Sequence, residues 1–171
     1  TQILVATDDE RILEVVRRGG FQAVMTRNDH PSGTDRVAEA VATSDVAAVI
    51  GLQADEPFLD PSDLDRLAQA VLEDTECWLA TLSAPLDGLR DFLDPNVVKV
   101  VLGTDNRALY FSRSPIPYPR PEGAAHLPAP PDRLPPAHLC RKHIGVYAWR
   151  REALIKFPAM PPSSLERCEG L

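Results

Sequence analysis

The sequence predicts an α/β protein with a Rossmann-like, mostly parallel sheet, helices on both faces of that sheet, and an added antiparallel hairpin or arm. Three observations support this fold class. Apolar runs of strand length alternate with amphipathic helical segments through the first half, and the links between them are short. The run VAAVIGLQ at 46–53 is uninterrupted, which is typical of a strand buried on both faces. A proline-rich segment at 115–136 excludes regular structure there and indicates an extended arm.

The elements of the first half are expected in alternation. The strands are expected at 2–7, 21–26 and 46–53, and the helices at 8–20, 32–44 and 60–74. Each helical segment has its apolar residues on one face. The third helix has the plainest start signal, because Asp60 suits the N-cap and Pro61 the first helical position.

The second half has a different pattern. Two strand-like runs flank the turn sequence GTDN, which predicts an antiparallel hairpin. Further strands and two short helices complete the list of expected elements: strands at 78–85, 97–102, 108–113 and 143–150, and helices at 151–157 and 163–171.

Length and composition favour a single soluble domain over 1–171. The hydrophobic content of 44% and the charged content of 25% are ordinary for a globular protein. A net charge of -7 argues against a nucleic-acid surface. No apolar run reaches the length of a membrane span, so no membrane contact is expected. The three cysteines match neither a disulfide framework nor a zinc cluster, which favours a reducing, cytoplasmic location.

Polar clusters follow the expected strands. They lie at 7–9, 26–36, 53–57 and 112–117. In a doubly wound sheet, ligands bind at the carboxyl ends of the strands, so these clusters together indicate a site.

The cluster at 26–36, TRNDHPSGTDR, suits an anion or a base. Gly33 permits close approach of the backbone, and the amides from Ser32 onward open a helix N-terminus. Arg27 and Arg36 add positive charge. Taken alone, the pattern equally suits an N-capped helix with a solvated loop.

The cluster QADEP at 53–57 suits a metal ion beside a nucleotide. Magnesium usually takes one or two protein carboxylates and completes its shell with water and phosphate. Asp55 or Glu56 could serve, and the Gln53 amide could contact the edge of a base. The alternative is that the two carboxylates are solvent-facing residues ahead of a helix.

Three residues of the second half are further candidates for the site. Arg113 follows an apolar strand and could bind a carboxylate through two hydrogen bonds. His143 and Tyr147 lie on the same face of their strand. The alternatives are a surface arginine, a satisfied core histidine and a buried tyrosine. Glycine-rich phosphate loops, GxSxG, HExxH and CxxC are absent from the sequence, so hydride transfer, P-loop hydrolysis and zinc chemistry lack support.

Six strings in order resemble one enzyme family closely. They are ATDDERI, MTRNDHPSGTDRVAEA, LQADEPF, DPNVVKVVL, ALYFSRSPIP and HIGVYAWR. The sequence is similar to the 3-deoxy-manno-octulosonate cytidylyltransferases, or CMP-Kdo synthetases, over nearly its whole length except the proline-rich arm. The implied fold is of the nucleotide-diphospho-sugar transferase type.

The resemblance implies a magnesium-dependent transfer of CMP from CTP to Kdo (3-deoxy-D-manno-octulosonate) for lipopolysaccharide biosynthesis, by a cytoplasmic homodimer. The family's functional residues fall on eight positions of this sequence. The nucleotide contacts are Arg27, Ser32, Gly33 and Gln53; the metal ligand is Asp55; the sugar contacts are Arg113, His143 and Tyr147. Of these, Asp55 and Arg113 are expected to act in catalysis.

The sequence also departs from the family. The family's opening basic loop, which grips the triphosphate, has no match, and its LEQLR glutamate and second metal-binding aspartate would follow Leu171. We therefore expect a piece of a longer chain. Ala54 replaces the usual glycine and would be strained at positive φ. The rival interpretations are a CMP-sialate or other sugar nucleotidyltransferase, and a non-catalytic nucleotide-binding remnant.

Overall fold

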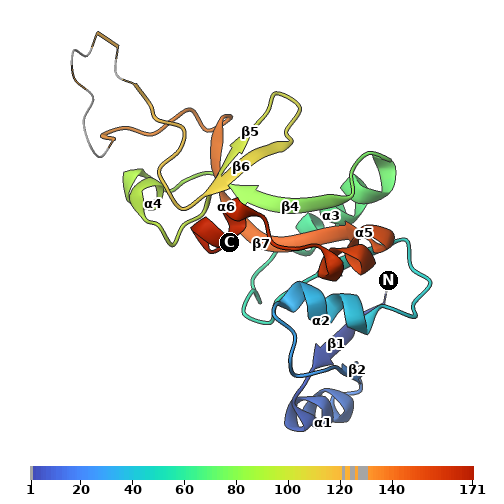
Figure 1. Cartoon of the computed structure of the whole chain (residues 1–171). Helices are drawn as coiled ribbons and strands as arrows, with labels where there is room; N and C mark the ends of the chain where they lie inside the picture. The colour runs from blue at the N-terminus through green and yellow to red at the C-terminus, as the bar shows by residue number, and fades with distance from the viewer. Residues whose placement is uncertain (1, 121, 124–125, 127–130) are drawn as a thin grey trace. The chain divides into compact units, whose positions relative to one another are not determined.

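The computed structural model describes residues 2–120, 122–123, 126 and 131–171 (Figure 1). The chain forms two compact units. The first unit consists of Thr1–Ala80 and Val146–Pro161, and the second of Thr81–Gly145 and Pro162–Leu171. Each unit therefore combines two separate segments of the chain, and each is described by itself.

The first unit begins with a parallel pair of strands joined by a helix (Figure 1). Strand β1 (Leu4–Thr7) pairs in parallel with β2 (Gln22–Met25), and α1 (Glu10–Arg18) connects them. Asp9 caps α1 by accepting a hydrogen bond from the amide of Arg11 at 2.8 Å. The Arg11 side chain also donates to this carboxylate, and the two bonds lower the pKa of Asp9 to about 2.

The core of the first unit lies among α2, α5 and the end of β7. Helix α2 (Gly33–Ala40) contributes Ala38, and α5 (Arg151–Lys156) contributes Leu154. Trp149 of β7 (Cys140–Arg150) packs beside the Phe157 ring, with ring centres 5.0 Å apart. Strand β3 (Ala48–Gly51) lies antiparallel to this part of β7 and adds Val49 to the cluster. The short helix η1 (Phe157–Ala159) follows α5.

Helix α3 (Pro61–Glu73) begins where the sequence predicts. The Asp60 side chain accepts from the amide of Ser62 at 2.9 Å, and Pro61 is the first helical residue. Leu67 and Val71 are buried on its inner face. The hydrogen bond of the cap satisfies one of the amides that a helix N-terminus leaves without an intrahelical partner.

The second unit contains the predicted hairpin. Strands β5 (Lys99–Leu102) and β6 (Ala108–Ser112) pair antiparallel, and Asn106 takes a left-handed φ of 62° in the turn. Residues 99–101 of β5 also pair antiparallel with the beginning of β7. The remaining elements are α4 (Leu89–Leu93) and α6 (Ser164–Glu169), while β4 (Leu79–Ala84) and β7 run through both units.

The α/β class is confirmed, but a mostly parallel sheet is not. Among the strand pairs of the described residues whose register is resolved, only β1 and β2 run parallel, whereas β7 lies antiparallel to both β3 and β5. The prediction rested on the alternation of strand-like and helix-like segments and on the apolar run at 46–53. Burial on both faces reports how a strand is covered and not the direction of its neighbour, so the pattern could not show the antiparallel partner.

The proline-rich arm forms neither helix nor strand in its described part, as predicted. Residues 121, 124–125 and 127–130 of the arm lie outside the described residues. Within the described part of the chain, every helix is too short or too polar to cross a membrane.

Candidate functional site

The first half of the candidate site follows the carboxyl ends of β1 and β2. Arg36, on the first turns of α2, reaches back to three groups: it donates to the Thr26 hydroxyl at 2.6 Å, the Arg27 carbonyl at 3.1 Å and the Asp8 carboxylate at 2.9 Å. Arg36 therefore ties both strand ends to the helix. Its charge, predicted as an attraction for an anion, is partly compensated by Asp8.

Loss of the Arg36 side chain and its hydrogen bonds is expected to destabilise the first unit. Arg36→Ala removes three hydrogen bonds, one of them to a carboxylate, and should lower the free energy of unfolding by about 2 kcal/mol. Arg18→Ala is the matched control, because Arg18 makes only an exposed ion pair with Glu14 and should change stability by less than about 0.5 kcal/mol. Urea unfolding of both variants measures the difference in the free energy of unfolding. Equal losses in the two variants would contradict the stabilising role of Arg36.

Ser32 and Gly33 start helix α2 as expected. The Ser32 hydroxyl accepts from the amide of Asp35 at 3.2 Å and thus acts as the N-cap. A Cβ placed on Gly33 would lie 3.9 Å from the side-chain nitrogen Nε2 of Gln53. The structure therefore brings two of the predicted nucleotide contacts together, since the open space above Gly33 borders on the Gln53 amide.

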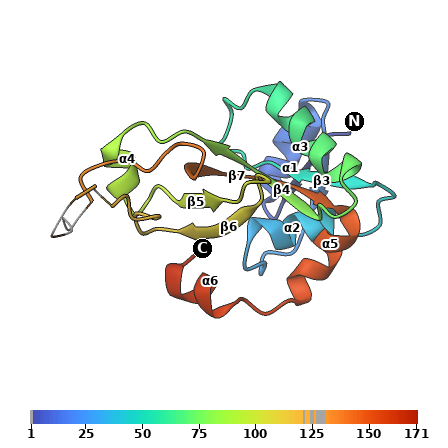
Figure 2. The ribbon, with the colours of Figure 1, turned by 90° about the horizontal axis from the view of Figure 1, so that it is seen from above.

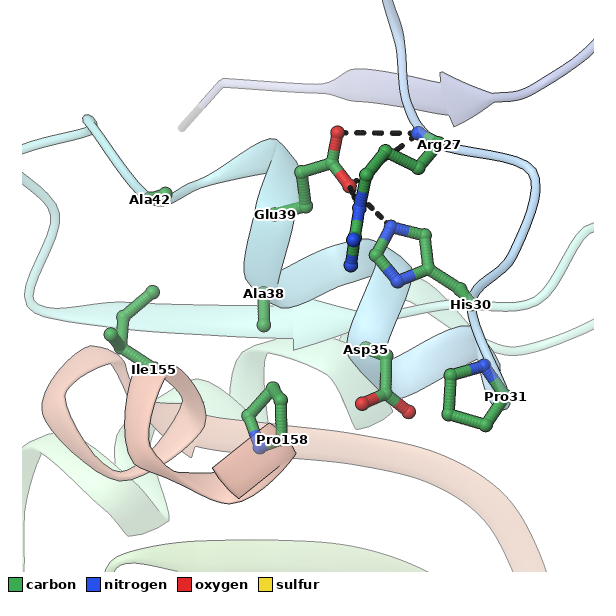
Figure 3. A pocket seen from close by; sticks show the side chains of 9 residues that line it. All are labelled: Arg27, His30, Pro31, Asp35, Ala38, Glu39, Ala42, Ile155 and Pro158. Atoms are coloured by element: carbon green, nitrogen blue, oxygen red, sulfur yellow. Dashed lines mark hydrogen bonds and ion pairs between the residues drawn. The ribbon is translucent and has the colours of Figure 1, made fainter.

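Arg27 lies in a second group beside α2, with His30 and Glu39 (Figure 3). The Arg27 amide donates to the Glu39 carboxylate at 3.2 Å, and the Arg27 guanidinium reaches the same carboxylate at 3.4 Å. His30, whose side chain is only 4% exposed, contacts Glu39 through Nε2. Desolvation acts to raise the pKa of Glu39, but the hydrogen bonds from His30 and Arg27 outweigh it and lower that pKa. Glu39 thus fixes the course of the loop that carries Arg27.

This group borders a shallow cavity of about 440 Å³. Figure 3 shows the Arg27, His30 and Glu39 side chains gathered on one side, with Ile155 and Pro158 on the side of α5 and η1. Sequence reasoning predicted Arg27 as a ligand contact but missed Glu39, because the two residues are twelve positions apart and no pattern links them.

Asp55 and Glu56 lie in an exposed turn after β3. The Gln53 carbonyl accepts from the Glu56 amide at 3.2 Å and closes this turn. The strain considered for Ala54 does not arise, because Asn106 is the only described non-glycine residue with a positive φ. Among the described residues, no three histidine, cysteine or acidic side chains gather as a metal cluster.

In the second unit, Arg113 is held by main-chain oxygens. Its guanidinium donates to the carbonyls of Glu169 at 2.7 Å, Gly170 at 2.9 Å and Pro95 at 3.1 Å. Figure 2 shows α6 beside β6, and Arg113 directly follows the last residue of β6. Arg113 is therefore neither a free surface arginine nor buried. Sequence reasoning missed Glu169, which lies 56 residues away.

Lys99 is a second residue that sequence reasoning missed. It is fully buried, and its ammonium donates to the carbonyls of Asp94, Val97 and Arg113 at 2.8, 2.6 and 2.7 Å. Burial lowers the pKa of Lys99. Three acceptors match the three N–H donors of an ammonium group, so the buried charge is fully solvated by main-chain oxygens.

His143 lies between β4 and β6. Its Nε2 is 2.9 Å from the Thr81 hydroxyl, and that hydroxyl donates its single proton to the Ile144 carbonyl at 3.1 Å. Thr81 must then accept from His143, which places the imidazole proton on Nε2. The edge of the ring meets Phe111, two residues before Arg113. Burial lowers the pKa of His143, so the ring is neutral at pH 7.

This burial predicts a pH dependence of stability. The pKa of His143 lies below its ordinary 6.5 in the folded chain, so the unfolded chain binds the proton first as the pH falls. The contribution of His143 is therefore constant above pH 6.5, and stability falls as the pH drops below that value. Urea unfolding at pH 7.5 and 5.5 should show a smaller fall for His143→Asn than for the wild type. The exposed His138→Asn should retain the full fall, and an unchanged fall in His143→Asn would contradict the prediction.

Tyr147 belongs to the first unit. It packs at the edge of the core cluster, with its ring 6.5 Å from that of Trp149, and burial raises the pKa of its phenol. The eight predicted site residues thus divide between the units: Arg113 and His143 in the second, and Arg27, Ser32, Gly33, Gln53, Asp55 and Tyr147 in the first.

Comparison with known proteins identifies the family of this chain. The sequence model of the cytidylyltransferase family matches residues 1–171. The 3-deoxy-manno-octulosonate cytidylyltransferase of Pelobacter propionicus is 43% identical over 171 residues, covering 99% of this chain and 66% of that protein. That of Geotalea daltonii is 42% identical over 176 residues, covering 100% of this chain and 67% of that protein.

A solved structure gives the same result. The structure of a CMP:2-keto-3-deoxy-manno-octonic acid synthetase complexed with CTP superposes with a TM-score of 0.83 at 40% identity, and covers 100% of this chain and 65% of that chain. The chain therefore belongs to the cytidylyltransferase family. The resemblance to the 3-deoxy-manno-octulosonate cytidylyltransferases is confirmed, and the chain spans about two thirds of the length of these relatives.

Proposed function

We propose that the protein transfers CMP from CTP to Kdo, giving CMP-Kdo and pyrophosphate for lipopolysaccharide biosynthesis. The observation that carries this proposal is the likeness, at 40% identity over the whole chain, to a synthetase complexed with CTP. The curated relatives that support it bear the name of the same activity. A cytoplasmic homodimer is part of the proposal, through the family resemblance.

The nucleotide half of the proposed site lies in the first unit. Gln53 would bind an edge of the cytosine, because its amide can both donate and accept. Its position beside the open space over Gly33 supports this role. The amides that follow Ser32 would face the phosphates or sugar of the nucleotide. Arg27 would add positive charge, on a loop whose course is fixed by Glu39.

Asp55 is the proposed ligand for Mg²⁺. The exposed turn after β3 fits this ion, since Mg²⁺ keeps several waters and is usually bound by one or two carboxylates together with substrate phosphate. When bound, the ion would neutralise charge that develops on the phosphates. Asp55 would contribute one carboxylate to this ion from the exposed turn after β3.

Arg113, His143 and Tyr147 are the proposed contacts of the sugar acid. A guanidinium carries five N–H donors, and three of those of Arg113 are used by main-chain carbonyls, which leaves two for a substrate carboxylate. The imidazole of His143 is held neutral and oriented by Thr81, which suits it to hydrogen bonding with sugar hydroxyls.

In the proposed reaction the anomeric 2-hydroxyl of Kdo attacks the α-phosphate of CTP in line. The new P–O bond forms as the bond to pyrophosphate breaks, and the hydroxyl proton passes to solvent. Catalysis of this kind consists mostly of positioning and charge neutralisation. The protein would therefore act chiefly by holding the acceptor hydroxyl against the α-phosphate.

The test is pyrophosphate release by the full-length protein with CTP and Mg²⁺, comparing Kdo with sialic acid as acceptor. Release that depends on Kdo is the expected result. Release with sialic acid alone would favour the CMP-sialate synthetase alternative. CTP binding without release from either acceptor would favour a non-catalytic remnant and contradict the proposal.

A further inference from the structure

The carboxylate of Glu169 accepts three hydrogen bonds from residues at the end of β6 and directly after it. The Tyr110 hydroxyl donates at 3.0 Å and the Ser112 hydroxyl at 2.6 Å, both to Oε1. The amide of Arg113 donates at 2.9 Å to Oε2. The bond from Ser112 is the largest of several that lower the pKa of Glu169, so the carboxylate remains ionised at neutral pH. Hydrogen bonds to an ionised carboxylate are stronger than those between neutral groups.

The contact between the two segments is reciprocal. While the Arg113 amide donates to the Glu169 side chain, the Arg113 guanidinium donates to the main-chain carbonyl of the same glutamate and to that of Gly170. These carbonyls lie at the C-terminal end of α6, where helix carbonyls lack intrahelical partners and a cation is favoured. Glu169 thus fixes both the backbone and the side chain of Arg113.

The other side of Arg113 is fixed as well. Its carbonyl accepts from the buried Lys99 ammonium at 2.7 Å. The peptide groups on both sides of Arg113 are therefore anchored to charged side chains, one from β5 and one from α6. With three guanidinium donors already directed at carbonyls, little freedom is left in the direction of the remaining two.

We propose that Glu169 is a positioning residue for the acceptor half of the site, and that α6 serves to aim the guanidinium of Arg113 at the carboxylate of the sugar acid. This role rests on the proposed function. The signal was absent from the sequence, because Glu169 contacts no substrate in this role and acts only through Arg113.

The test measures KM for Kdo and KM for CTP separately in the full-length protein. Glu169→Ala should raise KM for Kdo by about tenfold, as expected for a misdirected charged hydrogen bond, and should leave KM for CTP within about twofold. Glu169→Gln should restore most of the loss. A glutamine can turn its carbonyl to the Arg113 amide and its NH₂ to the two hydroxyls, which can also accept.

The matched control is Glu166→Ala on the same helix. Glu166 contacts Ser163 in the capping box and touches neither β6 nor Arg113 in the described contacts. Both substitutions weaken α6, but only one removes the contact with Arg113. The proposal is overturned if Glu166→Ala gives the same rise in KM for Kdo, if Glu169→Ala raises both constants equally, or if glutamine fails to restore the loss.

Two further measurements cover the remaining outcomes. If Glu169→Ala does not fold, Tyr110→Phe removes one of the three hydrogen bonds, and hydrogen exchange at the Arg113 amide reports the contact. Faster exchange with a raised KM for Kdo supports the role, and unchanged exchange and KM overturn it. A wild-type protein that releases no pyrophosphate overturns the proposed function and this role with it, whereas a working wild type matched by Glu169→Ala overturns this role alone.

Discussion

Asp55→Asn should lower the magnesium-dependent turnover of the full-length protein by about 100-fold or more, while its free energy of unfolding stays unchanged. Asparagine keeps the shape of the side chain and one carbonyl oxygen but loses the negative charge that attracts the ion. The fold should tolerate the change, because Asp55 is exposed and its side chain takes part in none of the described hydrogen bonds or ion pairs. Pyrophosphate release as a function of magnesium concentration measures the effect.

The matched control is Asp65→Asn, the same substitution at an exposed aspartate on α3. It should behave like the wild type at every magnesium concentration. Unchanged turnover in Asp55→Asn would falsify the metal assignment. A loss of turnover that extra magnesium partly reverses would support it, because a weakened site fills at higher ion concentration.

Lys99→Met is expected to lower the free energy of unfolding by about 3 kcal/mol, the largest effect on stability that the structure predicts. Methionine fills a similar volume but leaves the carbonyls of Asp94, Val97 and Arg113 without their common donor. A buried polar group that loses its partner costs about 1–3 kcal/mol, and relaxation of the chain or entry of water recovers part of the sum.

Lys142→Met provides the comparison within the same strand pairing. Lys142 lies opposite Lys99 in the register of β5 and β7, but its ammonium is partly exposed and pairs with Asp87 and Asp91. Its loss should cost less than about 1 kcal/mol. Chemical denaturation of both variants gives the two values, and equal costs would show that the three carbonyls do not depend on Lys99.

Elements with a local signal could be predicted from the sequence. The hairpin around GTDN and the start of α3 at Asp60 each depend on residues within one turn or one cap, and both are confirmed. The direction of β3 could not be predicted, because its partner in β7 lies about a hundred residues on and apolar composition carries no directional information.

The candidate site shows the same division. Ser32 was recognisable as the start of a helix, and the neighbouring Gly33 and Gln53 proved to be close. The burial of Lys99 could not be predicted, because a lysine in the middle of an apolar strand indicates neither burial nor a hydrogen-bond partner. Glu169 could not be predicted either, because its partners at the end of β6 lie far away in the sequence and the fold alone brings them together.

The interleaving of the two units affects the order in which the chain can fold during its synthesis. The first unit needs Val146–Pro161 to cover its helices, and the second needs Pro162–Leu171 to hold the end of β6. Domains made of one continuous segment can fold as soon as they leave the ribosome. Strand β3 cannot pair until β7 has been made, and the end of β6 cannot bind Glu169 until α6 has been made. Neither unit can therefore form these contacts early in synthesis. The nascent chain would meanwhile expose apolar strands, and chaperones would have their longest opportunity to bind it during that interval.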